Sequence, residues 1–268
     1  NVRRAGEDLR AGRPAITAGK KLRPAELGII ASLGIAEVAV RRRVRVALFS
    51  TGDELSSLGE ALAPGVVYDS NRYTLWGMLA RLNVELLDLG VVRDDPAALE
   101  AAFRQAAASA DAVITSGGVS VGEADYTKRI MAELGEVLFW RIAMRPGRPM
   151  AIGRIASGGQ SAILFGLPGN PVAVMVTFYA FVRDALLAMS GATAPPLLRA
   201  ASTQAIRKKP GRTEYQRGIV SRGAGGQWQV QITGAQGSGI LRSMSVANGL
   251  VVLGHEKGRT TSDRLRHN

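Results

Sequence analysis

Residues 44–54 read VRVALFSTGDE, an apolar run of strand length that ends directly in a polar turn with two carboxylates. A continuous apolar run is typical of a parallel strand that is buried on both faces of a sheet. The pattern returns in VELLDLG (84–90) and DAVITS (111–116). Helical spacing fills the intervals, with capping residues opening 69–82 and a proline near the first turn of 96–108. Repeated strand and helix units predict an α/β fold with a doubly wound, mostly parallel sheet.

The same domain extends further along the chain. The sequence predicts a helix over about 125–134, a strand over 137–144, and a hairpin around the glycines at 158–159. A long apolar helix over 171–189 then closes the domain, and SGATAPP (190–196) has the composition of a linker. The sheet is therefore expected to end before residue 195.

The C-terminal part has a different pattern. Short alternating segments, TEYQRGIV, QWQVQIT and GLVVLG, are separated by glycines, which is typical of a small β-barrel or sandwich. We therefore predict an α/β domain over 44–194 and a C-terminal β-barrel domain over 195–268. Residues 1–43 are expected to form a short helical or irregular piece and a basic strand, as part of a partial N-terminal domain. The start at Asn1 rather than methionine suggests a fragment.

Composition excludes several chemistries. Hydrophobic residues make up 46% of the chain and charged residues 21%, which is typical of a globular protein with a sizeable core. Cysteine is absent, so disulfides, thiolate metal sites and cysteine nucleophiles are excluded. His255 and His267 lie far in sequence from the motifs described below, so a metal would have to use oxygen ligands.

The net charge of +12 is unevenly distributed. Residues 1–43 carry +6 and residues 195–268 carry +9, whereas residues 44–194 carry −3. Because the basic residues lack interleaved aromatic residues, we expect steering of small anionic substrates and no nucleic-acid partner. No uninterrupted run of about 18 apolar residues and no signal sequence is found, so we expect no membrane span and a cytoplasmic location.

Three expected strand ends lead into polar loops. In a parallel sheet, ligands bind at the carboxyl ends of the strands, where such loops meet. Glu54, Asp94 and Asp125 each lie in one of these loops, and together they could bind Mg²⁺ through oxygen. The alternative is that Asp94 or Asp125 only caps the following helix and that Glu54 lies on the surface. Thr51, Gly52 and Asp53 share the first loop.

The third loop is rich in glycine. Backbone N–H groups around Gly117 and Gly118 could approach an anion at a helix N-terminus, and the hydroxyls of Ser116 and Ser120 could add hydrogen bonds. Phosphate is the natural ligand of such a loop. The loop matches no specific phosphate-binding signature, so an ordinary turn between strand and helix is the alternative.

Two further motifs suggest anion or ligand contacts. Arg141, Arg145 and Arg148 lie at or after another strand, and guanidinium groups suit phosphate or an oxyanion such as molybdate. GLPGNP (166–171) combines a rigid turn with a helix start, which makes Pro168, Gly169, Asn170 and Pro171 candidate binding residues. A basic surface turn and a purely architectural turn are the respective alternatives.

The order of these motifs resembles one known family. The matching strings are FSTGDEL (49–55), YDSNR (68–72), RDDP (93–96), SGGVSVGEADYTK (116–128), RPGRP (145–149), GLPGNP (166–171) and QGSGILRSMS (236–245). Together they resemble molybdopterin molybdenumtransferases, the MoeA and gephyrin E-domain family, over nearly the whole chain. Residues before Val44 resemble the re-entry into that family's first domain, whose earlier part and inserted second domain are missing here.

The resemblance implies a function and a set of site residues. It implies that molybdate is inserted into adenylylated molybdopterin with loss of AMP, with help from Mg²⁺, in a homodimer whose cleft is shared. Acidic residues matching Asp8, Glu54, Asp94 and Asp125 matter in the family, as do basic positions matching Arg141 and Arg145. Arg217 and Ser238 match barrel residues that face the cleft. The tail from about Gly258 departs from the family, so an altered barrel edge is expected.

Two other functions remain open at this point. The related molybdopterin adenylyltransferase shares the α/β domain, although the flanking segments and the barrel argue against that activity. A non-catalytic scaffold, as gephyrin-like proteins provide, is the other. The adenylyltransferase is also a candidate partner of a molybdenumtransferase.

Overall fold

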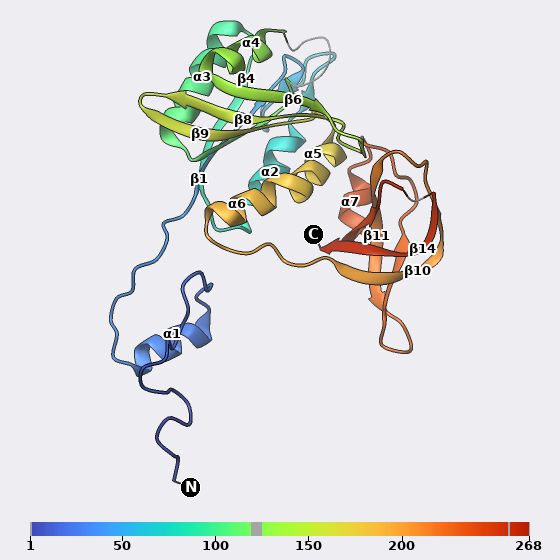
Figure 1. The fold of residues 1–268 in the computed structure, drawn as a ribbon. Helices are drawn as coiled ribbons and strands as arrows, with labels where there is room; N and C mark the ends of the chain where they lie inside the picture. Colours follow the sequence, from blue (N-terminus) through green and yellow to red (C-terminus); the bar gives the residue numbers. More distant parts are fainter. Residues whose placement is uncertain (1, 119–124, 257, 268) are drawn as a thin grey trace.

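A computed structural model gives the structure of residues 2–118, 125–256 and 258–267. An N-terminal arm, an α/β domain and a small β-barrel follow one another along the chain (Figure 1). The arm lies to one side of the α/β domain, whereas the barrel packs beside it. The order of the two folded parts agrees with the fold class expected from the sequence.

The α/β domain is built on a six-stranded sheet with the order β4-β1-β5-β9-β8-β6. The strands are β1 (Arg45–Thr51), β4 (Glu85–Val92), β5 (Ala112–Ser116), β6 (Gly135–Arg141), β8 (Pro149–Ser157) and β9 (Gln160–Leu167). β1 pairs in parallel with β4 and β5, and β5 pairs in parallel with β9. Only β8 runs against its two neighbours, β6 and β9. The sheet is therefore mostly parallel, as predicted.

Helices cover both faces of this sheet (Figure 1). The helices on one face are α3 (Pro96–Ser109) and α4 (Asp125–Leu134). The other face carries α2 (Ser70–Ala80) and a continuous helical segment made of α5 (Pro171–Thr177), the π-helical turn η1 (Phe178–Val182) and α6 (Arg183–Met189). Two apolar cores result, one on each face, and the inward side chains of β1 alternate between them.

Asp69 and Asp95 explain where two of these helices begin. The Asp69 carboxylate accepts a hydrogen bond from the Arg72 N–H at the start of α2, and Asp95 accepts one from the Ala98 N–H at the start of α3. Such caps satisfy backbone donors that the helix itself leaves free. The cap of α3 is thus Asp95, and not the neighbouring Asp94.

The helical segment Pro171–Met189 is long and apolar enough to cross a membrane, with a mean hydropathy of 1.7. Arg183 and Asp184 interrupt its apolar run, which is why the sequence contains no uninterrupted stretch of that length. More than half of its apolar window, 56%, is buried inside the protein, where it packs on the sheet. Its hydropathy is therefore accounted for by its place in the core.

The C-terminal part is a closed barrel of five strands with one borrowed strand at its edge. Its elements are β10 (Leu198–Arg207), β11 (Thr213–Arg222), β12 (Trp228–Ile232), α7 (Arg242–Val246), β13 (Gly249–Leu253) and β14 (Arg259–His267). The ring closes because β12 pairs with both β10 and β11. β14 pairs with β10 and β13, so the tail does form a barrel strand, whereas an alteration of this edge relative to the family stays a prediction.

Two short pairs complete the fold. β2 (Leu55–Ser56) pairs with β3 (Val67–Tyr68) in the connection between β1 and α2. β7 (Met144–Arg145) leaves the α/β domain and pairs in parallel with Thr213–Glu214 of β11. The chain after β6 is therefore hydrogen-bonded to the barrel.

The arm contains one helix, α1 (Pro24–Ser32), and no strand in its described residues 2–44. The basic strand expected there is wrong, and the side chains of Arg41 and Arg42 instead contact the α/β domain. Arg42 forms a two-pronged ion pair with Asp111, and Arg41 lies against Gly191, where a Cβ atom would come within 2.7 Å of Arg41 Nε. These contacts attach the arm to the domain.

Candidate anion-binding site

The carboxyl ends of five strands share one edge of the main sheet. β1, β4, β5 and β9 are parallel, and β6 has their direction because β8 runs against both β6 and β9. The loops after these strands therefore lie along one edge, where open α/β sheets bind their ligands. Arg141 is the last residue of β6 and stands at this edge with the loops of Thr51, Asp94 and Ser116.

The first two loops are in direct contact. The Asp94 N–H donates a hydrogen bond of 3.2 Å to the Asp53 carboxylate. Asp53, Glu54 and Asp94 are all exposed, and the Glu54 carboxylate folds over Gly52, where a Cβ atom would come within 2.6 Å of it. Three carboxylates thus face solvent within two neighbouring loops.

The structure does not gather the expected magnesium ligands into a preformed centre. Within residues 2–118, 125–256 and 258–267, no group of three or more Asp, Glu or His side chains is placed to hold a metal ion. Asp125 is the first residue of α4, but its side chain lies outside the described part, as does Ser120. Asp8 lies exposed on the arm and not at the sheet edge. A role for these residues stays a prediction.

The glycine-rich loop is packed tightly against the end of β1. Gly117 has a φ of +93°, and a Cβ atom there would come within 2.4 Å of the Thr51 carbonyl oxygen. Its N–H donates to the Leu167 carbonyl at 3.1 Å, so this group is used inside the protein. Gly118 packs in a similar way on Thr51 and Thr127. Both glycines therefore have an architectural role, and anion binding by the loop stays a prediction.

Ser116 and the GLPGNP turn are joined by Asn71. The Asn71 amide nitrogen donates to Ser116 Oγ at 2.9 Å and to the Gly169 carbonyl at 2.7 Å. In the same turn, Gly169 and Asn170 are exposed, while Pro171 occupies the first turn of α5. From the sequence, Asn71 was expected only to help cap the helix over 69–82, because its two partners lie 45 and 98 positions away in the chain.

The α/β domain and the barrel meet at two points near this edge. The Val172 N–H, in the first turn of α5, donates to the Ser238 carbonyl of the barrel at 3.1 Å. The Thr213 N–H of the barrel donates to the Ala143 carbonyl at 2.8 Å, beside the pairing of β7 with β11. The RPGRP turn follows, and Gly147 approaches Thr177 of α5 so closely that a Cβ atom would come within 2.5 Å of its methyl group. Both contacts bring barrel residues to the start of α5 and to the basic turn.

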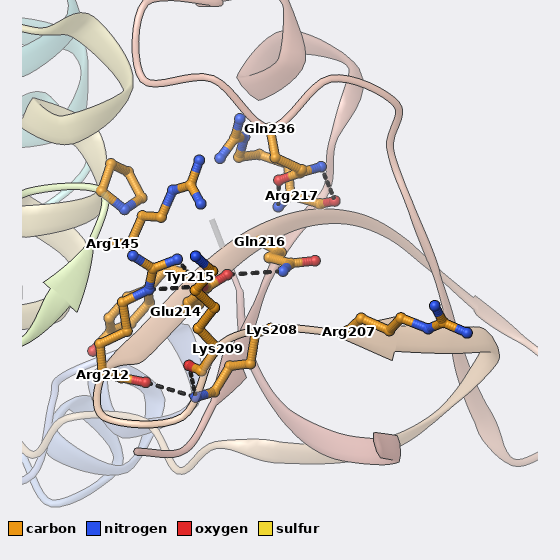
Figure 2. A pocket seen from close by; sticks show the side chains of 11 residues that line it. Arg145, Arg207, Lys208, Lys209, Arg212, Glu214, Tyr215, Gln216, Arg217 and Gln236 are labelled. Atoms are coloured by element: carbon orange, nitrogen blue, oxygen red, sulfur yellow. Dashed lines mark hydrogen bonds and ion pairs between the residues drawn. The ribbon is translucent and has the colours of Figure 1, made fainter. Parts of the chain in front are cut away.

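A basic pocket of about 410 Å³ lies at this junction (Figure 2). Six of its lining residues are basic and only Glu214 is acidic; the lining is Arg145, Pro146, Arg207, Lys208, Lys209, Arg212, Glu214, Tyr215, Gln216, Arg217 and Gln236. Arg145 and Pro146 come from the α/β domain, and the rest come from the barrel. The surplus of positive charge favours an anionic ligand.

Arg217 is the most deeply buried of these cations, with 1% of its surface exposed. Its guanidinium donates to Ser243 Oγ at 3.0 Å and to the Ala235 and Gly237 carbonyls at 3.4 and 3.1 Å. In the described part of the chain all its hydrogen-bond partners are neutral. Burial, and after it the positive charge of Arg145, lowers the pKa of Arg217. A guanidinium group stays charged in proteins. Because the partners of Arg217 are neutral, no carboxylate bonded to it compensates this buried charge.

Lys208 has a structural role in this pocket. Its ammonium group donates to the carbonyls of Lys209, Arg212 and His255, at 3.0, 2.7 and 3.3 Å, and thereby closes the turn between β10 and β11. Figure 2 shows two of these bonds. Lys208 is half-buried, whereas Lys209 is exposed. Glu214 is bound by Arg212 at 2.7 Å and by Gln216 at 3.1 Å.

The remaining predicted arginines do not line the pocket. Arg141 and Arg148 are exposed, and the Arg148 carbonyl accepts a hydrogen bond from the Ile142 N–H at the base of the basic turn. Of the three arginines predicted from the motif, only Arg145 is a lining residue. Arg207, Arg212 and Lys209 also line it and were missed, because only the turn between β10 and β11 brings them together.

The fold and this site define a doubly wound α/β domain joined to a small β-barrel, with a basic pocket at their junction. Comparison with known families then assigns both parts. Residues 47–188 match the family described as "Probable molybdopterin binding domain", and residues 199–260 match the "MoeA C-terminal region (domain IV)". Because the first match covers more than half of the chain, the chain belongs to this molybdopterin-binding family.

Individual relatives agree with this assignment. A molybdopterin molybdenumtransferase from Haemophilus influenzae is 42% identical over 98% of this chain and 65% of its own length. A molybdopterin molybdenumtransferase 2 from Mycobacterium tuberculosis is 36% identical over 94% of this chain and 62% of its own length. A crystal structure of a molybdopterin biosynthesis MoeA protein from Pyrococcus horikoshii superposes with a TM-score of 0.79 at 29% identity, covering 97% of this chain and 63% of that one. The chain thus spans less than two thirds of the length of these relatives.

Proposed function

We propose that this chain is the part of a molybdopterin molybdenumtransferase that inserts molybdate into adenylylated molybdopterin. In this reaction two Mo–S bonds replace Mo–O bonds of molybdate, and the dithiolene thiol protons together with protons from solvent convert the displaced oxygens to water. One water cleaves the phosphoanhydride, which releases AMP. The names of the relatives support this activity, and none of those described above is named an adenylyltransferase. No contact in the described chain favours the scaffold alternative.

The observation that carries the proposal is the buried charge of Arg217. A buried cation with only neutral partners is unfavourable unless an anion completes its surroundings. Arg145 and Arg217 line the same pocket, and the positive charge of Arg145 also lowers the pKa of Arg217, so both guanidinium groups are available to one anionic ligand. Molybdate is a tetrahedral dianion, and we propose that Arg145 and Arg217 bind it, with the half-buried Ser238 on the neighbouring loop as a further contact.

The sheet edge would bind the other substrate. We propose that Thr51, Ser116 and the 168–171 turn hold adenylylated molybdopterin, since they lie between the acidic loops and the barrel. Mg²⁺ commonly binds through one or two carboxylates together with substrate phosphates, which fits the exposed pair Glu54 and Asp94. When bound there, Mg²⁺ would supply positive charge to the phosphoanhydride. The residues of the chain contribute positioning and electrostatic stabilisation, and the mechanism needs no covalent nucleophile.

We also propose a homodimer in which the arm reaches a second copy. The arm leaves the α/β domain (Figure 1), and its apolar side chains at Leu27, Leu33, Ile35, Val38 and Val40 are exposed in the single chain. Exposed apolar groups in one segment favour an interaction surface. The N-terminal part of the arm, which carries Asp8, extends away from the α/β domain (Figure 1), and we propose that Asp8 contributes to the site of the second copy. Light scattering measures the mass: a dimer supports this proposal, and a monomer at high concentration contradicts it.

One reaction tests the proposed activity. The protein is incubated with adenylylated molybdopterin, molybdate and Mg²⁺, and AMP release is measured together with formation of active cofactor. We expect AMP release to depend on molybdate. AMP formation from ATP and molybdopterin would instead identify an adenylyltransferase. A cytoplasmic location and an adenylyltransferase partner stay predictions.

A further inference from the structure

Asn71 occupies a rigid position at the start of α2. Asn71 is 8% exposed, and its neighbours Asp69 and Arg72 hold the start of the helix through contacts of their own. Asp69 accepts from the Arg72 N–H at 3.1 Å, and the Arg72 guanidinium pairs with Asp88 of β4 at 2.7 Å. The direction of the Asn71 side chain is therefore set by the backbone and by these charged contacts.

The amide of Asn71 is shared between two loops. Because the Gly169 carbonyl can only accept, the atom that faces it at 2.7 Å must be the amide nitrogen. The second N–H of the same group then reaches Ser116 Oγ at 2.9 Å. One side chain thus holds the end of β5 and the turn after β9 at a fixed spacing.

This spacing extends to the barrel. Gly169 lies two residues before α5, and the Val172 N–H in the first turn of α5 donates to the Ser238 carbonyl. Arg217 holds the same barrel loop through the Ala235 and Gly237 carbonyls. Hydrogen bonds and short stretches of chain therefore connect Asn71 through the 168–171 turn to the basic pocket.

The carbonyl oxygen of Asn71 is buried and has no donor among the described residues. The hydroxyl of Thr51, the last residue of β1, is also buried and also has no hydrogen-bond partner among the described residues. Buried polar atoms without partners are uncommon in folded proteins. Two of the seven such atoms in the described chain thus lie at this strand edge, where a bound ligand could donate to them.

From these contacts we infer that Asn71 is a positioning residue for the proposed reaction. It holds Ser116 and the 168–171 turn so that a ligand at the sheet edge is aligned with the anion in the barrel pocket. The inference rests on the proposed function for its kinetic consequence, whereas its structural consequence can be measured without any substrate.

The test compares Asn71→Asp and Asn71→Ser with Ser70→Ala. The aspartate keeps the shape of Asn71 but lacks both donors, and the serine covers the case in which the aspartate does not fold. Ser70 is the exposed neighbour on the same helix turn and serves as the matched control. Amide hydrogen exchange of the full chain is measured without substrate, followed by kcat and KM for adenylylated molybdopterin.

We expect faster exchange in 116–118, 167–172 and 236–241 in both Asn71 variants, with the rest of the sheet unchanged. We expect kcat/KM to fall by about 10- to 100-fold, mainly through kcat, because misalignment affects the transition state more than binding. Ser70→Ala should resemble the unmodified protein in both measurements.

Other outcomes overturn the inference. Exchange that rises across the whole domain would make Asn71 a general stability residue. A rise in KM with unchanged kcat would mean that Asn71 binds substrate directly. If both variants fail to fold, proton exchange of the Asn71 side-chain amide is measured in the unmodified protein. Rapid exchange there would contradict its two hydrogen bonds and overturn the inference. Absence of turnover in the unmodified protein would reject the proposed function and leave the exchange result to be judged separately.

Discussion

The acidic sheet edge and the basic barrel pocket differ in how much of their geometry the protein itself provides. At the edge, Asp53, Glu54 and Asp94 are exposed. In the pocket, Arg217 and Lys208 are held by three hydrogen bonds each. The pocket cations are thus held by the protein itself, whereas the carboxylates face solvent. We therefore expect a preformed anion pocket beside a carboxylate site that a bound ligand would complete.

Removing Arg217 should have the largest effect. Arg217→Ala leaves two carbonyls and a hydroxyl without their donor, so the free energy of unfolding should fall by about 3 kcal/mol. Molybdate-dependent turnover should be lost as well. Chemical denaturation and the AMP assay measure both, with exposed Arg222→Ala as the control, whose bond to Gly226 and contact with Trp228 are worth about 1 kcal/mol or less. A stable, active Arg217→Ala protein would mean that the pocket is not preformed in this way.

A second test addresses the acidic edge with two adjacent carboxylates. Asp94→Asn should reduce kcat/KM by about 100-fold while changing stability by less than about 0.5 kcal/mol. Asp95→Asn removes the same charge from the same loop, but asparagine still caps α3, so both activity and stability should persist. Equal kinetic losses in the two variants would assign the effect to net charge rather than to the proposed position of Asp94.

A third comparison separates the two lysines of the pocket turn. Lys208→Met removes the donor of three carbonyls and should lower stability by about 1–2 kcal/mol at every salt concentration. Lys209→Met should leave stability unchanged and lower kcat/KM about twofold at low salt, an effect that fades by about 0.15 M because exposed charges are screened. A salt titration of both variants measures this. Should Lys208→Met be as stable as Lys209→Met, the carbonyl contacts contribute nothing.

The smallest effect concerns Asp111, a carboxylate with partners of its own. The hydrogen bond from Arg42 holds the pKa of Asp111 below its ordinary value. Its stabilising contribution should therefore be complete above about pH 5, beyond the unfolded pKa of about 3.9, and should be lost as the pH falls through the lower folded pKa. Denaturation of the unmodified protein and of Asp111→Asn between pH 6 and 2 should show a difference that shrinks with acid. A difference that does not change with pH would contradict this role.

The α/β domain was predictable from the sequence, because its central strands β1 and β5 are buried on both faces. β1 and β5 appear as plain apolar runs, and the alternation of strands and helices confirms the doubly wound sheet. β10 and β14 were missed, since their polar and charged residues resemble loops. Strands of a small barrel bury only one face, and their register depends on partners far away in sequence.

The candidate site was predictable only in part. Parallel strands share an edge, so the first loops could be placed together from their positions alone, and the contact between Asp53 and Asp94 follows from that topology. The tight fit of Gly117 on Thr51 and the carbonyl contacts of Lys208 depend on tertiary packing, which no local pattern encodes. Arg217 was identified from the family resemblance, and its burial could not be predicted from the surrounding sequence.

β7 also bears on how this molecule can be divided. The residues Met144–Arg145 belong to the α/β domain by connectivity and to the barrel by hydrogen bonding. A barrel excised at the linker before β10 would expose the backbone of Thr213–Glu214, and an uncovered strand edge invites pairing with other chains. The barrel is therefore not independent of the α/β domain. A chimera that takes its barrel from a relative would also have to take that relative's RPGRP turn, because the structural unit consists of two segments that are separated in sequence.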